Sequence, residues 1–230
     1  MLDDLRAEVL EMNLELPRNR LVVWSGGNVS GRDPESGCVV IKPSGVPFDR
    51  LTIDSMVVVA PDGSIKAGGL KPSVDLGIHL YLYAARPDVF GVTHTHSPYA
   101  TSFSLNGEGI PAALTPLTHL IGGGVACTRY ATPGAEDTGA AIIESVGDSG
   151  KAAIVARHGV FTLGASAGKS LEIALHVEEA AMTIRLAQQS GAVTPMDDAE
   201  IARCAAWYRA NYGQQPAHTV QEAVVGKDQP

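Results

Sequence analysis

Two histidines at alternate positions, His94 and His96, are the side chains in this sequence best suited to chemistry. They end a run, residues 89–96, whose apolar beginning is typical of a buried strand. Because alternate side chains of a strand point to one face, both imidazoles would project together from a rigid support. Paired imidazoles suit zinc, copper, nickel or iron, although such a pair can also lie by chance on a solvated strand face. The spacing therefore predicts a candidate metal site.

A catalytic zinc needs three or four protein ligands and an open position for substrate. His158 lies between two strand-like runs, and the following Gly159 allows backbone or a ligand to approach closely. Asp75 lies in the first turn of a predicted helix, where the helix dipole favours a carboxylate. The ordinary alternatives are a hydrogen-bonded histidine and a helix-terminal aspartate. His79 shares a helix face with Asp75 and is a further candidate, either as ligand or as partner of a ligand, but a helix-surface or packing role is favoured.

Three short segments offer donors that suit an anion: Gly27-Asn28-Val29-Ser30, Lys42-Pro43-Ser44-Gly45 and Lys71-Pro72-Ser73. Each combines backbone N–H groups in a tight turn with hydroxyl, amide or ammonium donors, and such turns bind phosphate without an excess of positive charge. Taken singly, each is better explained by ordinary turn chemistry. The spacing of the glycines misses the Walker and dinucleotide-binding patterns, so nucleotide cofactors are not supported.

The elements that must position these side chains alternate between helices and strands. Periodicity and capping predict helices at residues 3–16, 74–85 (capped by Ser73), 98–104, 166–189 and 197–211. Apolar runs predict strands at residues 21–24, 38–41, 56–59 (continuing past a turn to residue 65), 89–96, 152–156 and 160–163, with a glycine-rich bend at residues 25–31. We expect one α/β domain over residues 1–214, a three-layer α/β/α fold around a mostly antiparallel sheet, and a polar tail at residues 215–230.

The charge balance narrows the class of partner. The chain has 230 residues, 25 acidic against 17 basic, and a formal net charge of −8. Without a basic cluster, nucleic acid and anionic membranes are poor partners, and a phosphorylated substrate would need local donors. Three widely spaced cysteines predict free thiols in a reducing compartment, and neither a signal peptide nor a membrane-spanning run is evident. We expect a soluble, cytoplasmic protein.

In their order along the chain, these segments resemble the class II aldolase and adducin family, and within it the branch of 4-epimerases that act on ketopentose phosphates. The closing Tyr212-Gly213-Gln214 and an aspartate rather than a glutamate at position 75 lean toward that branch. The matching stretches are residues 27–30, 40–46 (Val-Ile-Lys-Pro-Ser-Gly-Val), 56–59, 71–75 (Lys-Pro-Ser-Val-Asp), 94–97 (His-Thr-His-Ser), 158–161 (His-Gly-Val-Phe) and 211–214 (Asn-Tyr-Gly-Gln).

The resemblance implies roles for individual residues. It implies one zinc ion per subunit, a sugar-phosphate substrate and a homotetramer with four-fold symmetry and sites at the subunit interfaces. Tyr212 corresponds to an acid/base tyrosine that, in the family, reaches into a neighbouring subunit's site. The implied zinc ligands are Asp75, His94, His96 and His158, and the implied substrate- and phosphate-binding residues are Gly27, Asn28, Lys42, Ser44, Gly45 and Ser73.

Two positions depart from the epimerase pattern. Val74 replaces a second serine and so removes one hydroxyl from the phosphate pocket. His119 stands where the epimerases have a catalytic aspartate. Since histidine transfers protons near neutral pH, His119 is a candidate to act with Tyr212, one on each face of the substrate carbonyl. The alternatives are a bystander histidine, a different substrate or plain aldolase chemistry.

The implied reaction is zinc-dependent epimerisation of L-ribulose 5-phosphate to D-xylulose 5-phosphate, by cleaving and re-forming the bond between carbons 3 and 4. The first alternative is a class II aldolase that performs the same cleavage on a related sugar phosphate and releases the fragments. The second is a non-catalytic interaction module like the adducin head domains, which lack the metal ligands. All four ligand positions are filled in this chain.

Overall fold

One eight-stranded sheet forms the centre of the computed structural model, which describes residues 1–212; the predicted tail at residues 215–230 lies outside the described residues. The strands follow the order β4-β3-β2-β1-β5-β8-β7-β6. Every neighbouring pair is antiparallel except β6 with β7, which confirms the predicted fold class. The strands are β1 (Asn28–Arg32), β2 (Val39–Ile41), β3 (Val57–Val59), β4 (Ile65–Ala67), β5 (Gly91–Thr95), β6 (Ala126–Cys127), β7 (Ala152–Val155) and β8 (Gly159–Gly164).

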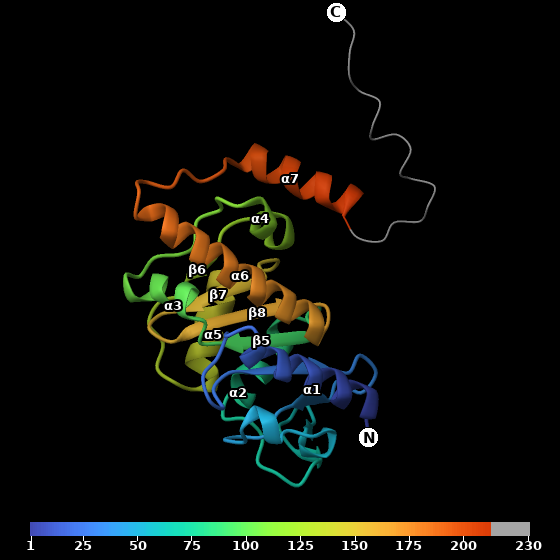
Figure 1. Cartoon of the computed structure of the whole chain (residues 1–230). Coiled ribbons are helices and arrows are strands. Elements are labelled where there is room, and N and C mark those ends of the chain that lie inside the picture. The colour runs from blue at the N-terminus through green and yellow to red at the C-terminus, as the bar shows by residue number, and fades with distance from the viewer. Residues whose placement is uncertain (213–230) are drawn as a thin grey trace, which may run out of the picture.

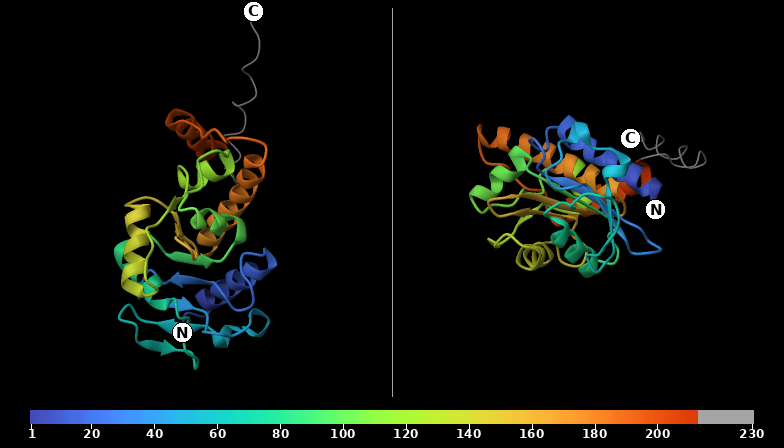
Figure 2. Two further views of the ribbon diagram at one scale, coloured as in Figure 1. Left: turned by 90° about the vertical axis from the view of Figure 1, so that its left-hand side faces the viewer. Right: turned by 90° about the horizontal axis from the view of Figure 1, so that it is seen from below.

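Helices cover both faces of this sheet (Figure 2). Consecutive side chains of a strand alternate between the two layers: Val40 packs in the cluster with α1 and α6, whereas Val39 packs in the cluster with α2 and α5. Beyond one end of the sheet, α7 packs on α4 and α4 on α6 (Figure 1). The helices are α1 (Asp3–Arg18), α2 (Leu76–Ala85), α3 (Pro98–Leu105), α4 (Thr115–Ile121), α5 (Ala135–Val146), α6 (Ala167–Gln188) and α7 (Asp198–Asn211), with short 3-10 helices at Phe48–Arg50 and Ile53–Ser55.

The strand predicted at residues 21–24 is wrong. Leu21 and Val22 are buried, but Val23 and Trp24 are 82% and 79% exposed, and Trp24 has a φ of 58°. The strand lies instead at Asn28–Arg32, which overlaps the predicted glycine-rich bend at residues 25–31, and pairs with both β2 and β5. Residues 28–32 have a weak strand propensity, but they contact α1, where Asn13 hydrogen-bonds to both the amide and the carbonyl of Val29.

Helix α2 also begins later than predicted. Asp75, not Ser73, is the N-cap residue, and Leu76 is the first helical residue. The hydroxyl of Ser73 accepts a 3.4 Å hydrogen bond from the Asp75 amide, so it holds the approach to the helix. The sequence patterns did not predict α4, β6 or α5. Helix α4 and strand β6 are short, with 7 and 2 residues. Helix α5 contains an internal glycine, Gly139, which packs against the ring of Tyr81.

Candidate metal centre and adjoining anion pocket

Three histidines converge where the central strands β5 and β8 meet. His94 lies in β5 and His96 just beyond its end, while His158 directly precedes β8. The strands pair Thr95 with Val160, so the ends that hold the histidines are adjacent. The possible ligand atoms of the three imidazoles all lie within 4.8 Å of one another. The structure thus brings together three of the four predicted metal ligands in a group that can hold a metal ion.

Close backbone packing makes this convergence possible. A Cβ atom at Gly159 would lie 2.2 Å from the carbonyl oxygen of Thr95 and 3.0 Å from Cδ2 of His96, so a larger residue would push the strands apart. Arg157, immediately before His158, has a φ of 61°, which is unfavourable for a residue with a side chain. Such strain persists where the surrounding structure fixes the backbone, and it is frequent at functional sites.

The buried His94 ring is oriented for metal binding. Its Nδ1 lies 3.0 Å from the carbonyl oxygen of Val160, which can only accept, so Nδ1 carries the proton and Nε2 keeps its lone pair. The ring also stacks on Phe161, at 4.1 Å between centroids and 12° between planes. Burial lowers the pKa of His94 to about 3, although Asp75 opposes the shift. The imidazole is therefore neutral near pH 7, the form that coordinates metals.

The spacing of the ring nitrogens fits one ion. The Nε2 atoms of His94 and His96 lie 3.1 Å apart. Two nitrogens bound tetrahedrally to zinc at 2.0–2.1 Å are separated by about 3.3 Å. Burial, together with His158, also lowers the pKa of His96, which favours the neutral ring there too. The neutral imidazoles of His94 and His96, with the ring of His158 beside them, suit a divalent metal ion.

Asp75 adds a carboxylate to the same cavity, although it is not part of the tight histidine group. Asn28 donates from Nδ2 to Oδ2 of Asp75 at 2.7 Å and to the hydroxyl of Ser73 at 3.0 Å. Burial raises the pKa of Asp75, but the neighbouring His94 and His79 and the hydrogen bond from Asn28 together hold it below its ordinary value. Asp75 is therefore ionised and offers the negative charge that a divalent cation needs.

His79 occupies the protein core and does not line this cavity. Its Nδ1 lies 2.7 Å from the hydroxyl of Ser30, which in turn lies 2.8 Å from the hydroxyl of Tyr83. Burial lowers the pKa of His79 to about 4, opposed by Asp75. Of the favoured prediction for His79, a helix-surface or packing role, the packing role agrees with this placement, and the surface position is wrong because the side chain is fully buried.

A cavity of about 310 Å³ joins the histidines to the predicted phosphate-binding segments. Ser25, Gly26 and Val74 also line this cavity. Ser25 and Gly26 were not predicted as site residues. Ser25 lies at the start of the predicted glycine-rich bend, and its backbone carbonyl rather than its side chain is the partner of Lys42. The lining includes every predicted ligand and substrate-binding residue: Gly27, Asn28, Lys42, Ser44, Gly45, Ser73, Asp75, His94, His96 and His158.

Two of the predicted turns form a single paired structure. The Ser44 amide donates to the carbonyl of Lys71 at 2.9 Å, and the Ser73 amide donates to the carbonyl of Lys42 at 3.0 Å. These bonds hold Ser44 and Ser73, which both line the cavity, next to each other. The turn ends at Gly45, whose φ of 68° suits glycine.

Lys42 supplies the cationic side chain of the cavity lining. It is 2% exposed, donates from Nζ to the carbonyl of Ser25 at 2.8 Å and lies 4.7 Å from the centroid of the Phe48 ring. Burial lowers the pKa of Lys42 to about 8, although Asp75 raises it. The ammonium group is thus mostly charged at neutral pH and can attract an anion in a chain whose net charge repels it.

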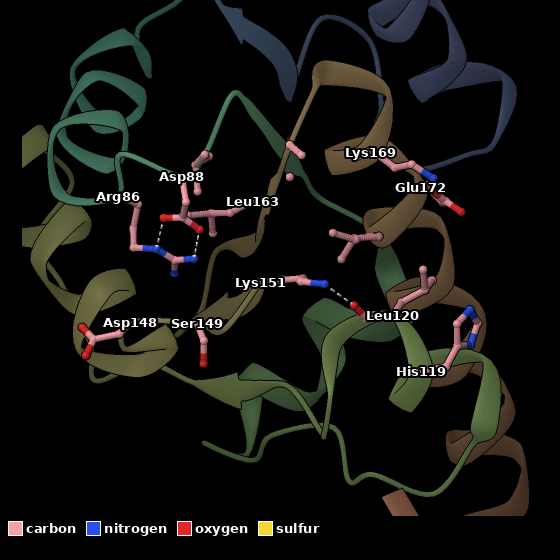
Figure 3. A pocket seen from close by; sticks show the side chains of 14 residues that line it. Arg86, Asp88, His119, Leu120, Asp148, Ser149, Lys151, Leu163, Lys169 and Glu172 are labelled. Atoms are coloured by element: carbon pink, nitrogen blue, oxygen red, sulfur yellow. Dashed lines mark hydrogen bonds and ion pairs between the residues drawn. The ribbon is translucent and has the colours of Figure 1, made fainter. Parts of the chain in front are cut away.

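His119 and Tyr212, the predicted acid/base residues, do not line this cavity. They lie together where α4 meets α7, with ring centroids 5.7 Å apart, and His119 stacks on Tyr208, which the sequence patterns did not identify. His119 also borders a second cavity of about 480 Å³ (Figure 3).

The charges around this second cavity are largely satisfied by protein partners. Arg86 pairs with Asp88 at 2.7 Å, Lys169 pairs with Glu172 at 2.7 Å, and Lys151 donates to the carbonyl of Leu120 at 2.7 Å. Although this cavity is larger, it contains no converging group of metal ligands among the described residues. The candidate chemistry therefore belongs to the smaller cavity. Among residues 1–212, no helix is both long and apolar enough to cross a bilayer.

Comparison with known proteins agrees with this arrangement. The chain is 38% identical over 205 residues to the L-ribulose-5-phosphate 4-epimerase UlaF of Salmonella paratyphi C (strain RKS4594), covering 84% of this chain and 90% of that protein. The structure of an L-fuculose 1-phosphate aldolase superposes with a TM-score of 0.84 at 26% identity, covering 90% of this chain and 96% of that one. An L-fuculose-1-phosphate aldolase from Thermus thermophilus shares the fold, with a TM-score of 0.69 at 23% identity, covering 83% of this chain and 98% of that one.

The sequence model described as "Class II Aldolase and Adducin N-terminal domain" matches residues 7–184, which include every predicted metal ligand. The match begins in α1 and ends near the C-terminus of α6, so it contains the whole sheet. The chain therefore belongs to the class II aldolase and adducin family, as an enzyme similar to the L-ribulose-5-phosphate 4-epimerases.

Proposed function

We propose that this protein is a cytoplasmic zinc enzyme that converts L-ribulose 5-phosphate to D-xylulose 5-phosphate. The observation that carries the proposal is a single cavity in which three imidazoles converge beside a lysine and two hydroxyl-bearing turns. The identity of 38% to an L-ribulose-5-phosphate 4-epimerase supports the choice of substrate. The ligands would be Asp75, His94, His96 and His158. Bound zinc would supply Lewis-acid polarisation of the ketose carbonyl and its neighbouring hydroxyl.

The paired turns would hold the substrate by its phosphate. Ser44, Gly45 and Ser73 offer hydroxyl and backbone donors, and Lys42 offers a positive charge. A base removes the proton of the carbon 4 hydroxyl, and the bond between carbons 3 and 4 breaks to give glycolaldehyde phosphate and the enediolate of dihydroxyacetone. Because the phosphate stays bound, the aldehyde can turn over and present its other face before the bond re-forms.

Re-forming the bond on the other face requires an acid/base group on each face of the aldehyde. We assign these two roles to Tyr212 and His119. Neither side chain lines the metal cavity of its own chain. We therefore propose that they serve the cavity of a neighbouring copy, within a homotetramer whose sites lie at the subunit interfaces. A closed ring of this kind needs head-to-tail contacts, in which one patch of each subunit meets a different patch of the next.

An aldolase is the second candidate. The likeness to an L-fuculose 1-phosphate aldolase and the exposed Val74, which offers no hydroxyl to the cavity, favour it. The two functions differ in whether the fragments are retained. A non-catalytic, adducin-like role is not favoured, because all four ligand positions are filled.

Incubation of zinc-loaded protein with L-ribulose 5-phosphate tests the proposal. We expect D-xylulose 5-phosphate to form with a stoichiometric zinc content and no free glycolaldehyde phosphate. Release of an aldehyde fragment, trapped by a coupled dehydrogenase, would identify an aldolase instead. Zinc-free, inactive protein would point to the adducin-like role.

A further inference from the structure

The imidazole of His119 is held by its own helix through one nitrogen. Nδ1 lies 3.1 Å from the backbone carbonyl oxygen of Thr115, one turn earlier in α4. Since a carbonyl oxygen only accepts, Nδ1 must carry the proton and donate it. In the neutral ring the lone pair therefore resides on Nε2. If His119 transfers protons, Nε2 is the atom that does so.

The face of the same imidazole is covered by Tyr208 of α7. The two rings are nearly parallel, at 10°, with centroids 3.8 Å apart. A ring flip of His119 would exchange the positions of Nδ1 and Cδ2, and so break the bond to Thr115 and redirect Nε2. Parallel stacking opposes that rotation, because a turning imidazole must pass through the space of the tyrosine ring.

Tyr208 also contacts the second proposed acid/base group. Its centroid lies 5.6 Å from that of Tyr212, which in turn lies 5.7 Å from His119. His176 of α6 approaches His119 edge-on, at 6.4 Å. Among the described residues, no carboxylate hydrogen-bonds to His119. The Thr115 carbonyl and the Tyr208 ring are thus the contacts that fix this imidazole.

The stack is not the only attachment of α7 to α4. The hydroxyl of Thr118 lies 3.6 Å from the Cys204 sulfur, and the Met196 amide, just before α7, donates to the carbonyl of Ala112 at 2.8 Å. Ala205 is buried in the same contact region. Loss of the Tyr208 ring should therefore leave α7 in place and free the imidazole, whose face it covers at the shortest distance.

We infer that Tyr208 is a positioning residue: it holds the imidazole of His119 in the Nδ1-protonated form, with Nε2 as the proton-transfer atom. The inference rests on the proposed function in so far as it concerns turnover. The conformation of the ring can be measured without substrate.

Three variants of the zinc-loaded, full-length protein test this role. Tyr208→Phe keeps the aromatic face, Tyr208→Ala removes it, and Arg203→Ala truncates an exposed side chain of the same helix as a control. The ring ¹⁵N chemical shifts of His119, measured by long-range ¹H–¹⁵N correlation, report its tautomer. Steady-state kinetics with L-ribulose 5-phosphate report kcat and KM separately, and the melting temperature reports folding.

We expect Tyr208→Phe and Arg203→Ala to match the parent protein in tautomer, kcat and KM. Tyr208→Ala should show a mixed tautomer and a kcat lowered by roughly 10- to 100-fold with little change in KM, as expected for a misplaced catalytic group. A Tyr208→Ala protein with the parent tautomer would overturn the inference. So would a Tyr208→Phe protein as impaired as Tyr208→Ala, since the hydroxyl and not the ring face would then matter.

The two proposals fail in different ways. If the parent protein does not turn over L-ribulose 5-phosphate, the proposed function fails, while the tautomer comparison still decides whether Tyr208 fixes the ring. If Tyr208→Ala changes the tautomer but leaves kcat unaltered in an active enzyme, His119 is not the proton-transfer group and the inference is overturned. A fall in melting temperature with an unchanged tautomer would make Tyr208 a packing residue only.

Discussion

At the scale of single residues, the proposed metal ligands and the proposed proton-transfer groups lie apart. The imidazoles of His94, His96 and His158 converge within one chain, whereas His119 lies near α7, outside their cavity. Substitutions in the two groups should therefore have different consequences. Substitution of a converging histidine should remove the metal, whereas substitution of His119 should leave it in place.

We predict that His158→Ala abolishes stoichiometric zinc binding and turnover together, because the site loses one of its converging nitrogens. His119→Ala should retain zinc and lower kcat by about 10²–10⁴-fold, the usual effect of removing a general acid or base. Zinc content by atomic absorption and kcat measured on the same samples check both. Unchanged turnover in His119→Ala would make this histidine a bystander.

Lys42 should make substrate binding depend on pH. Its pKa is lowered to about 8 by burial, with Asp75 opposing the shift, so its charge is present below this pH and is lost above it. The KM for L-ribulose 5-phosphate should rise roughly ten-fold between pH 7 and pH 9 as the ammonium deprotonates. Lys42→Met should have a high KM with little dependence on pH in this range.

Lys71 offers a matched control, since it is an exposed lysine of the partner turn that does not line the cavity. Lys71→Met should keep the KM of the parent protein and its pH profile. A parent KM that stays flat from pH 7 to pH 9 would show that the charge of Lys42 does not bind the phosphate.

At the scale of elements, one helix caps another. Glu178 of α6 accepts hydrogen bonds from the backbone amides of Tyr99 and Ala100, at 2.9 and 2.8 Å, in the first turn of α3. Burial raises the pKa of Glu178, opposed by these same bonds. The contact fixes α3, which directly follows the end of β5 that carries the candidate metal ligands His94 and His96.

We predict that Glu178→Ala lowers the free energy of unfolding by about 1–3 kcal/mol, because two helix amides lose their acceptor. Glu179→Ala is the matched control: this neighbour is exposed, and its carboxylate lies 3.3 Å from the ring of His176. It should change stability by less than about 1 kcal/mol. Urea denaturation of both variants at neutral pH gives the comparison. Equal losses would show that the capping bonds contribute nothing specific.

At the scale of the whole molecule, the strands β5 and β8, next to which the proposed metal ligands lie, are in a different region of the chain from α7 (Figure 1). The proposed tetramer would combine the two regions from adjacent copies. Each chain has a formal net charge of −8, which repels a phosphorylated substrate. The local donors of the cavity must therefore outweigh this repulsion.

Mixed oligomers test this arrangement. His96→Ala and Tyr212→Phe chains should each be inactive alone. When co-expressed, random assembly should restore roughly a quarter of the sites, because a site needs intact ligands from one chain and an intact tyrosine from its neighbour. Activity of purified hetero-oligomers provides the measurement. Absence of any recovery, in oligomers shown to contain both chains, would contradict shared sites.

Much of the site could be predicted from the sequence because its signals are local. The two-residue spacing of His94 and His96 fixes their shared direction once β5 forms, and the Gly159 position requires close contact with β5. Periodicity likewise located most helices and the mostly antiparallel sheet. The error at residues 21–24 arose because four apolar side chains look like a strand, while the sheet used the less apolar Asn28–Arg32.

The sequence by itself determined which residue types could bind a metal and an anion, since spacing along a strand or turn dictates local geometry. Only the tertiary structure decided that the turns at Lys42 and Ser73 are paired, that His79 packs in the core, and that Tyr208 covers His119. These are contacts between segments far apart in the chain, and their energies depend on packing that no local pattern encodes.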